Sequence, residues 1–287
     1  MSVIVKKTVP IAIFLSLVAL NACEPADQQP APPPDEQIVP TNRPIMPADK
    51  IKDIGEGENR YLLLVYVRMI IVSVPPGTVS GSETLWSYLD EERVSPLRSA
   101  SLGRNGLRAG VARRDSWPDL EKMLEQATGR QLKMTTLISQ PGEPVAIVMK
   151  QRQPVQTIFV YSDEKTLSGR DYPAGDNLLS LYCTLNAEDP SKIMITAVPQ
   201  IRSTAQRPQF VTGEGLPRLA SLPDYYSFDA ATFQAMLPSR DVLVLGPGSH
   251  SARRSSIAHM LLTREIEGVE HETVLILIPE VFATPIR

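Results

Sequence analysis

The sequence predicts a β-rich α+β protein, with an N-terminal α+β unit over residues 60–150 and an antiparallel β domain over residues 151–287. Three observations predict this class. A long apolar run opens the folded part, two segments with helix-start signals follow it, and beyond about residue 150 the hydrophobic period becomes two. Residues 1–59 have a different composition and are not expected to join this fold.

The run over residues 61–74, YLLLVYVRMIIVSV, is apolar on both faces and is stopped by a proline-proline-glycine sequence. It is shorter than the ~20 residues that a membrane-spanning helix needs, and it carries Arg68 inside it. We therefore expect a strand buried on both faces. A further strand, LRAGVA, is expected after the tight turn that Asn105-Gly106 predicts.

Two helices are predicted in the first unit. Ser80 and Glu83 are spaced as a capping box ahead of TLWSYLDEE. Ser116 and Asp119 open a second helix, LEKMLEQATG, which Gly129 is expected to end. Each helix carries a tryptophan, which we interpret as a core residue.

Alternating hydrophobicity predicts the strands of the second unit. Hairpins are expected around residues 186–191 and around Gly268, and loops over residues 202–227. The six expected strands cover residues 156–162, 178–185, 192–201, 241–246, 258–266 and 273–282.

The N-terminus reads as an export signal over residues 1–22. Lys6 and Lys7 precede an uncharged apolar run at residues 8–20, which has the length of a signal-peptide core and is too short to span a bilayer. The run ends in Leu-Asn-Ala-Cys, which resembles the lipobox of bacterial lipoproteins. The resemblance implies that Cys23 is lipidated, with acyl chains such as palmitate. The alternative is an ordinary signal peptide cut near Ala22 that leaves Cys23 as a free thiol.

Lipidation would place the protein at a membrane. Each buried methylene contributes about 0.8 kcal/mol, so two or three chains hold firmly where one binds reversibly. In the sorting rule that the lipoprotein resemblance brings in, Asp after the cysteine retains a protein in the inner membrane. Glu24 stands there, which favours the periplasmic face of the outer membrane over the inner membrane.

Residues 23–59 are expected to form a disordered tether. They are rich in Pro, Gln, Asp and Glu and almost free of aromatic residues, so they cannot bury enough apolar surface to offset the ordering entropy. Extended as polyproline II, about 36 residues at ~3.1 Å each would reach about 110 Å. A Pro-rich ligand for a partner domain is the alternative interpretation.

Charge and motifs argue against several classes of protein. The formal net charge is -3, from 29 basic and 32 acidic residues, without the basic stripe of a nucleic-acid-binding protein. The histidines 250, 259 and 271 have no metal-binding spacing. Gly246-Pro247-Gly248 follows an apolar strand, but Pro247 removes a donor that a phosphate-binding turn needs. Cys183 lies on the apolar face of an expected strand and is interpreted as a core residue. We therefore assign no catalytic, cofactor or metal site.

KIMITAVPQI, DVLVLGPG and HETVLILIPEVF follow one another in the last part of the chain. These three segments resemble landmarks of the secretin module, the outer-membrane ring of type II and type III secretion and pilus systems. The resemblance implies a β scaffold and a place in the cell envelope. SHSARRSSIAHM departs from the family pattern after Gly248, and residues 202–227 look too short and Pro-rich for gate hairpins. We therefore do not expect a pore. The matching residues are Val198, Pro199, Ile201, Val242, Val244, Leu245, Gly246, Gly248, Leu275, Ile276, Ile278, Pro279 and Val281.

The functional prediction is a lipid-anchored envelope module that binds or assembles with an unknown envelope protein, without nucleic acid and without enzyme activity. Arg253-Arg254 is interpreted as a solvated loop, with an acidic partner or a lipid headgroup as the alternative. The alternative function is a hydrolase of envelope polymers with a site built by the loop over residues 163–176. Its candidate acids are Asp163, Glu164, Asp171 and Asp176.

Overall fold

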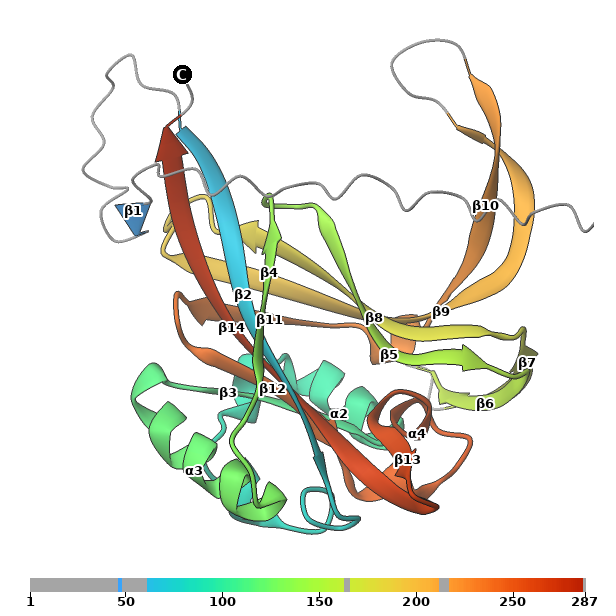
Figure 1. Ribbon diagram of the computed structural model, residues 1–287, viewed down its shortest axis with the longest axis horizontal. Coiled ribbons are helices and arrows are strands. Elements are labelled where there is room, and N and C mark those ends of the chain that lie inside the picture. Colours follow the sequence, from blue (N-terminus) through green and yellow to red (C-terminus); the bar gives the residue numbers. More distant parts are fainter. Residues whose placement is uncertain (1–45, 48–60, 163–165, 212–216, 286–287) are drawn as a thin grey trace, which may run out of the picture. The chain divides into compact units, whose positions relative to one another are not determined.

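A computed structural model describes residues 46–47, 61–162, 166–211 and 217–285 of the chain. The fold is β-rich α+β with antiparallel sheets, as the sequence predicts (Figure 1). The signal peptide and Cys23 lie outside the described residues, and so does the predicted tether over residues 23–59 except for Met46 and Pro47. Those two residues form a short strand that pairs with Phe282 and Ala283, so the expectation that residues 1–59 do not join the fold is wrong at this point. Within the described residues, no helix combines the length and apolar character needed to cross a membrane.

The first sheet has seven strands in the order β3-β12-β14-β2-β4. β1 and β13 also pair with β14, at its two ends. All residues of β2 pair with β14 in one continuous register, from Tyr61 opposite Pro285 to Val74 opposite Glu272. The strands are β1 (Met46–Pro47), β2 (Tyr61–Val74), β3 (Leu107–Ala112), β4 (Met134–Ser139), β12 (Val242–Pro247), β13 (Thr263–Ile266) and β14 (Val269–Pro285).

The second sheet has five strands in the order β10-β9-β8-β5, with β11 also paired to β9. A separate two-stranded ribbon joins β6 to β7. The strands are β5 (Pro144–Gln153), β6 (Gln156–Tyr161), β7 (Leu167–Tyr172), β8 (Gly175–Leu185), β9 (Lys192–Val211), β10 (Arg218–Ser227) and β11 (Phe233–Pro238). The predicted hairpins at residues 186–191 and at Gly268 are confirmed, joining β8 to β9 and β13 to β14.

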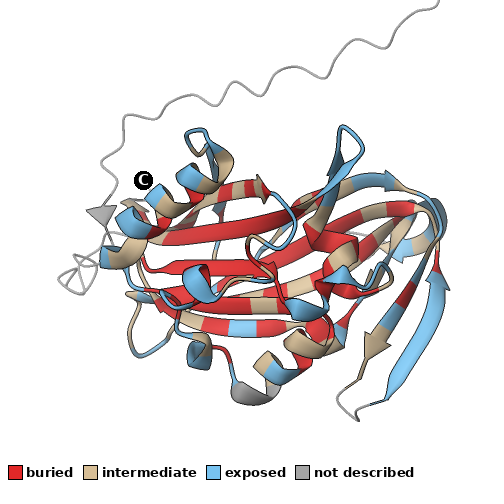
Figure 2. Ribbon diagram, turned by 90° about the horizontal axis from the view of Figure 1, so that it is seen from below, coloured by how far each residue is buried: buried red, intermediate tan, exposed pale blue. Residues whose placement is uncertain are grey.

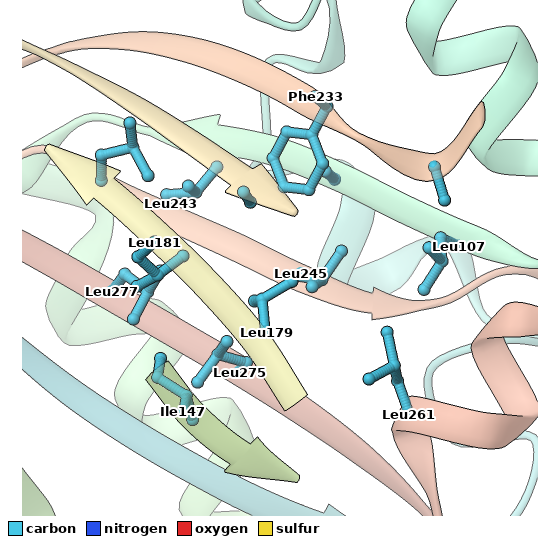
Figure 3. Packing of buried hydrophobic residues seen from close by; sticks show 14 of the residues in the cluster. Leu107, Ile147, Leu179, Leu181, Phe233, Leu243, Leu245, Leu261, Leu275 and Leu277 are labelled. Carbon is cyan, nitrogen blue, oxygen red and sulfur yellow. The ribbon is translucent and has the colours of Figure 1, made fainter. Parts of the chain in front are cut away.

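The central strands of the first sheet are buried on both faces, which explains their apolar runs. Along β14, Leu275 and Leu277 face the core between the two sheets, while Val274 and Ile276 face the helices. The inter-sheet core contains Phe233, Leu179 and Leu181 (Figure 3). Figure 2 shows the same strands as almost continuously buried. Successive side chains of these strands therefore still alternate between the two faces of the sheet, and they are apolar on both faces because each face packs against a core.

Only the start of the first predicted helix forms, since the helix ends at Trp86 where TLWSYLDEE was expected to continue it to Glu92, and its cap differs from the prediction. α1 (Glu83–Trp86) is capped by Ser82, whose hydroxyl accepts the amide hydrogen of Thr84 at 3.2 Å. Ser80 is not the cap because its hydroxyl donates to the Glu272 carboxylate. A tertiary contact thus takes the side chain that local spacing assigned to the helix. The 3-10 helix η2 (Glu91–Arg93) follows α1.

The second predicted helix is α3 (Trp117–Thr128), which packs Leu120 and Leu124 against the first sheet. Gly129 ends it at φ 67°, as predicted. Ser116 makes no side-chain capping bond, because the preceding 3-10 helix η3 (Arg114–Ser116) gives it helical dihedral angles.

Two segments differ from the prediction at the level of element type. Residues 258–266 are not one strand: α4 (Ile257–Leu262) precedes β13, and the Ser256 hydroxyl accepts the amide hydrogen of His259 at 3.1 Å to cap α4. The short helix is buried almost all round, so it has no amphipathic period to distinguish it from a strand. The sequence reading also missed α2 (Pro96–Arg104).

The described residues of the range 202–227 form strands for the most part, so the prediction of loops there is wrong. β9 continues to Val211 and pairs with β10 up to Arg218. Prolines and polar residues along both strands obscured the pattern, because such residues are rare in buried strands but are tolerated at edges. The remaining short elements are η4 (Asp229–Ala231) and η5 (Ser249–Ala252).

Residues 43–287 form one compact unit, and the first sheet takes strands from both sides of residue 150. β2, β3 and β4 come from the predicted first unit, while β12 and β14 come from the second. Residue 150 marks the change in hydrophobic periodicity along the sequence. That it is also a boundary between two domains stays a prediction.

Candidate functional site

The β9–β10 hairpin extends beyond the sheet to which it belongs. β8 begins at Gly175, opposite Ser203, so the outer part of β9 has only β10 as a neighbour among the described residues. In Figure 1 this part rises away from the body of the protein. A two-stranded ribbon is marginally stable by itself. Its base must therefore hold it.

The outer hairpin exposes large apolar side chains. Phe210 is 80% exposed, and Leu219, directly opposite it, is 62% exposed. Directly opposite residues lie on the same face of a ribbon, so these two form one apolar pair. Leu222 and Tyr225 lie nearer the base and are also exposed. Aromatic and large aliphatic residues in this setting mark a contact surface rather than a folding core.

The edges of the ribbon are less suited to binding than its faces. Pro208 on β9 and Pro223 on β10 each remove a backbone donor, which disfavours pairing with a further strand. Arg207 and Asp224 form a salt bridge at 2.9 Å between the two strands. The side chains of Phe210 and Leu219 thus offer the stronger basis for recognition.

Ionic and aromatic contacts hold the base of the hairpin. Arg202 pairs with Asp176 at 2.6 Å, and Asp176 also accepts the amide hydrogen of Arg152 at 2.8 Å. The hydrogen bond from Arg202 is the main cause that lowers the pKa of Asp176. Tyr172 contacts the ring of Tyr226 with centroids 5.9 Å apart. The hairpin therefore leaves the body in a defined direction.

The four acids of the alternative hydrolase site do not form a catalytic pair in the described residues. Asp163 and Glu164 lie outside those residues. Asp171, on β7, accepts a hydrogen bond from the Thr157 hydroxyl at 2.6 Å. Asp176 is engaged by Arg202 and has a lowered pKa, whereas a general acid needs a raised one.

The remaining candidate residues have structural positions. Cys183 is buried in the inter-sheet core, and burial raises the pKa of its thiol to about 11, so it is not an activated nucleophile. Trp86 is buried as predicted, and its indole donates to the carbonyl of Val79 at 3.0 Å. Trp117 is partly buried and packs against the same core. No group of three or more metal-binding side chains is found in the described part of the chain.

The turn after β12 serves packing rather than phosphate binding. A Cβ added at Gly246 would come within 3.0 Å of the Trp86 ring, and the amide of Gly248 donates to the carbonyl of Gly106 at 2.7 Å. Of the basic pair after it, the Arg253 guanidinium lies 5.2 Å from the centre of the Tyr161 ring. Arg254 is exposed and lies 3.6 Å from Glu270.

The sequence reading missed the exposed hairpin residues. Its one usable signal was TGEG between QFV and LPRLAS, a glycine-containing turn between two segments of strand formers. Cys23, the predicted lipid attachment residue, lies outside the described residues, so its lipidation stays a prediction.

Comparison by structure finds secretins among the neighbours of this chain. No family model matches the sequence, and no curated protein matches it. The InvG secretin of the Salmonella SPI-1 type III injectisome is 9% identical, with a TM-score of 0.17 over 80% of this chain and 65% of that one. A chain of the Klebsiella pneumoniae type II outer membrane complex of PulD, PulS and the PulC HR domain is 8% identical, with a TM-score of 0.18 over 83% of this chain and 41% of that one. The V. cholerae type IV competence pilus secretin PilQ is 9% identical, with a TM-score of 0.17 over 83% of this chain and 63% of that one.

This chain spans less than two thirds of the length of each of these three chains. At TM-scores below 0.2 the neighbours carry no argument about shared architecture or activity. The relation to secretins that three short sequence segments suggest therefore stays a prediction.

Proposed function

We propose that this protein is a lipid-anchored module of the bacterial envelope with a binding or assembly role, held at the periplasmic face of the outer membrane by Cys23. Its contact surface is the outer β9–β10 hairpin, and its partner is another envelope protein. It does not form a pore by itself.

The anchor part of the proposal rests on the sequence. A basic start, an apolar run and Leu-Asn-Ala-Cys stand in the order that lipoprotein export requires. The folded part first includes the chain at Met46 of β1, so some 22 residues separate Cys23 from it, a length that at ~3.1 Å per residue lets the folded part reach about 70 Å from the membrane. A protein on such a tether can meet partners at a distance from its lipid.

One observation carries the binding role: an apolar pair, Phe210 and Leu219, is presented on the outer part of a hairpin that is held at its base, and neither residue belongs to the core. Burying such a pair gains about 25 cal/mol per Å² of apolar surface. Leaving it in water during the life of a monomer would be unfavourable for solubility. A partner protein that covers Phe210 and Leu219 would gain this free energy and would remove the exposed apolar surface.

Site-specific photo-cross-linking in intact envelopes tests the binding surface. A benzophenone amino acid replaces Phe210 in one variant and Phe159 in the control, because Phe159 is also an exposed phenylalanine but lies on the β6–β7 ribbon. We expect a discrete cross-linked protein from position 210 that is weak or absent from position 159. The double substitution Phe210→Ser with Leu219→Ser should separate the partner from the protein in mild detergent. Equal cross-linking from both positions would contradict the assignment.

Two further measurements test the anchor and the absence of a pore. Mass spectrometry of the mature N-terminus should find Cys23 carrying acyl chains, and an unmodified Cys23 would remove the anchor.

Size analysis in mild detergent should give either a species near the 31.6 kDa of the single chain or a species with the mass of one chain and its partner. A large homo-oligomeric ring would refute the statement that the chain forms no pore.

A further inference from the structure

A polar pocket of about 580 Å³ lies where β5, α4, β13 and β14 meet. Figure 1 shows β5, α4 and β13 next to one another in this part of the fold. The side chains of Lys150, Gln151, Gln153, His259 and Arg264 line it. Its lining residues include none of the hairpin and neither Asp171 nor Asp176.

An irregularity in β5 places Lys150 at this pocket. Val148 is opposite Leu178 and Lys150 is opposite Asn177, so two steps on β5 match one step on β8. Such a β-bulge redirects the side chains that follow it, and bulges are frequent beside functional sites. Here the extra residue, Met149, is buried while Lys150 faces the pocket.

The Lys150 ammonium is fixed but not neutralised. It donates one hydrogen bond to the carbonyl of His259 in α4, at 2.7 Å. An ammonium has three donors, so two remain for other acceptors. Burial is the main cause that lowers its pKa to about 8, which leaves it charged at pH 7.

Arg264 supplies a second cation to the same pocket. Its guanidinium donates to the carbonyl of Met149 at 3.3 Å. Among the described residues, neither Lys150 nor Arg264 has a carboxylate within ion-pair distance. The two cations are close enough that Arg264 helps to lower the pKa of Lys150. Their mutual repulsion would be relieved by an anion between them.

The other charged groups restrict the anion. Glu265 and Glu270 also line the pocket, and Glu270 is paired with Arg254 at 3.6 Å. The charge of Glu270 raises the pKa of Lys150 more than Arg264 lowers it, so Glu270 already offsets part of the positive charge. Burial and the Lys150 charge lower the pKa of His259, so its ring is neutral near pH 7 and adds a donor and an acceptor. The two lining carboxylates would repel a phosphate dianion more than a singly charged, planar carboxylate, which also matches a guanidinium well.

We propose that this pocket binds a carboxylate group, held between the Lys150 ammonium and the Arg264 guanidinium. The side chains of Gln151 and Gln153 contact the polar remainder of the ligand, which is a small molecule or a peptide end that carries one carboxylate. The site does not depend on the binding role of the hairpin.

NMR titration of the purified full chain with N-acetylglycine, at constant ionic strength, tests the site. We expect saturable shifts at Gln151, Gln153 and His259, and none with the neutral N-acetylglycinamide. Lys150→Met and Arg264→Met should each weaken binding at least tenfold. Lys150→Arg should keep most of it because a cationic donor is retained.

Lys192→Met is the matched control, since Lys192 is a half-exposed lysine at the start of β9, where it pairs with Asp189 away from the pocket. It should leave the affinity unchanged. If Lys150→Met does not fold, the affinity of Arg264→Met for N-acetylglycine decides whether the pocket binds the carboxylate. Equal affinity in the control and the pocket variants would overturn the proposal, as would shifts of the same size with N-acetylglycinamide. Inorganic phosphate binding tenfold more tightly than N-acetylglycine would overturn the carboxylate assignment.

Discussion

Replacing Glu272 by alanine is expected to destabilise the protein strongly. Its carboxylate is 8% exposed and accepts the amide hydrogens of Gly77, Val79 and Ser80 at 2.8, 2.9 and 3.1 Å, besides the Ser80 hydroxyl. The substitution leaves the loop between β2 and α1 without an acceptor for any of these donors.

The magnitude follows from how deeply each donor is buried. A hydrogen bond to a charged group contributes about 1.5–3 kcal/mol, and an unsatisfied buried donor costs about 1–3 kcal/mol. The Val79 amide is buried, while the Gly77 and Ser80 amides are partly buried and can regain water. We therefore expect a loss of about 3–5 kcal/mol in the free energy of unfolding, a large part of the 5–15 kcal/mol typical of a folded protein.

Urea denaturation measures this change through the midpoint at an unchanged slope. Glu272→Gln should lose less, about 1–3 kcal/mol, because one oxygen still accepts while the new amide group faces other donors. Glu92→Ala is the control, since Glu92 is an exposed glutamate in η2. A Glu272→Ala protein within 1 kcal/mol of the natural one would show that the carboxylate does not hold the loop.

Three further changes have outcomes set by the structure. Phe233→Ala should lower the free energy of unfolding by about 3–5 kcal/mol because Phe233 is fully buried between the sheets; urea denaturation measures this, and a loss below 1 kcal/mol would contradict the packing. Gly129→Ala should lose about 1 kcal/mol because Gly129 has φ 67° at the end of α3, and an unchanged melting temperature would argue against that backbone conformation. The free energy of unfolding should rise by up to about 3 kcal/mol between pH 8 and 10.5, because Lys150 has a pKa of about 8 when folded and 10.5 ordinarily, so the unfolded chain binds more protons in that window. Lys150→Met should remove that rise, and a rise of equal size in the variant would place its cause elsewhere.

The parts of the fold that the sequence predicts are those where local pattern and tertiary packing agree. β14 and β12 alternate apolar side chains on two buried faces, and Gly129 occupies the left-handed position that ends α3. Both signals lie within a few neighbouring residues. They do not depend on contacts with distant parts of the chain.

The parts that escaped prediction depend on distant residues. Ser80 has the spacing of a helix cap, but Glu272, remote in sequence, takes its hydroxyl. α4 is short and buried on all sides, so its residues carry no period. The outer hairpin has the composition of a loop, and only the pairing of β9 with β10 makes Phe210 and Leu219 neighbours.

The candidate sites follow the same rule. Cys23 is found from a four-residue motif, because export signals are read as linear sequence. The pocket at Lys150 joins β5, α4 and β13, and no spacing in the sequence relates these segments. Its two cations become neighbours only through a β-bulge and a short helix.

The pairing of β2 determines how the protein would respond to force. β2 lies between β14 and β4, and β1, earlier in the chain, already pairs with β14 through Met46 and Pro47. A pull on the N-terminal segment therefore loads the two residue pairs of β1 before it reaches Tyr61. A pull along β2 then acts across the direction of the hydrogen bonds to its antiparallel neighbours. Every bond along β2 would have to shear at once, rather than open one after another from an end, so this pairing favours resistance to tension directed along the strand.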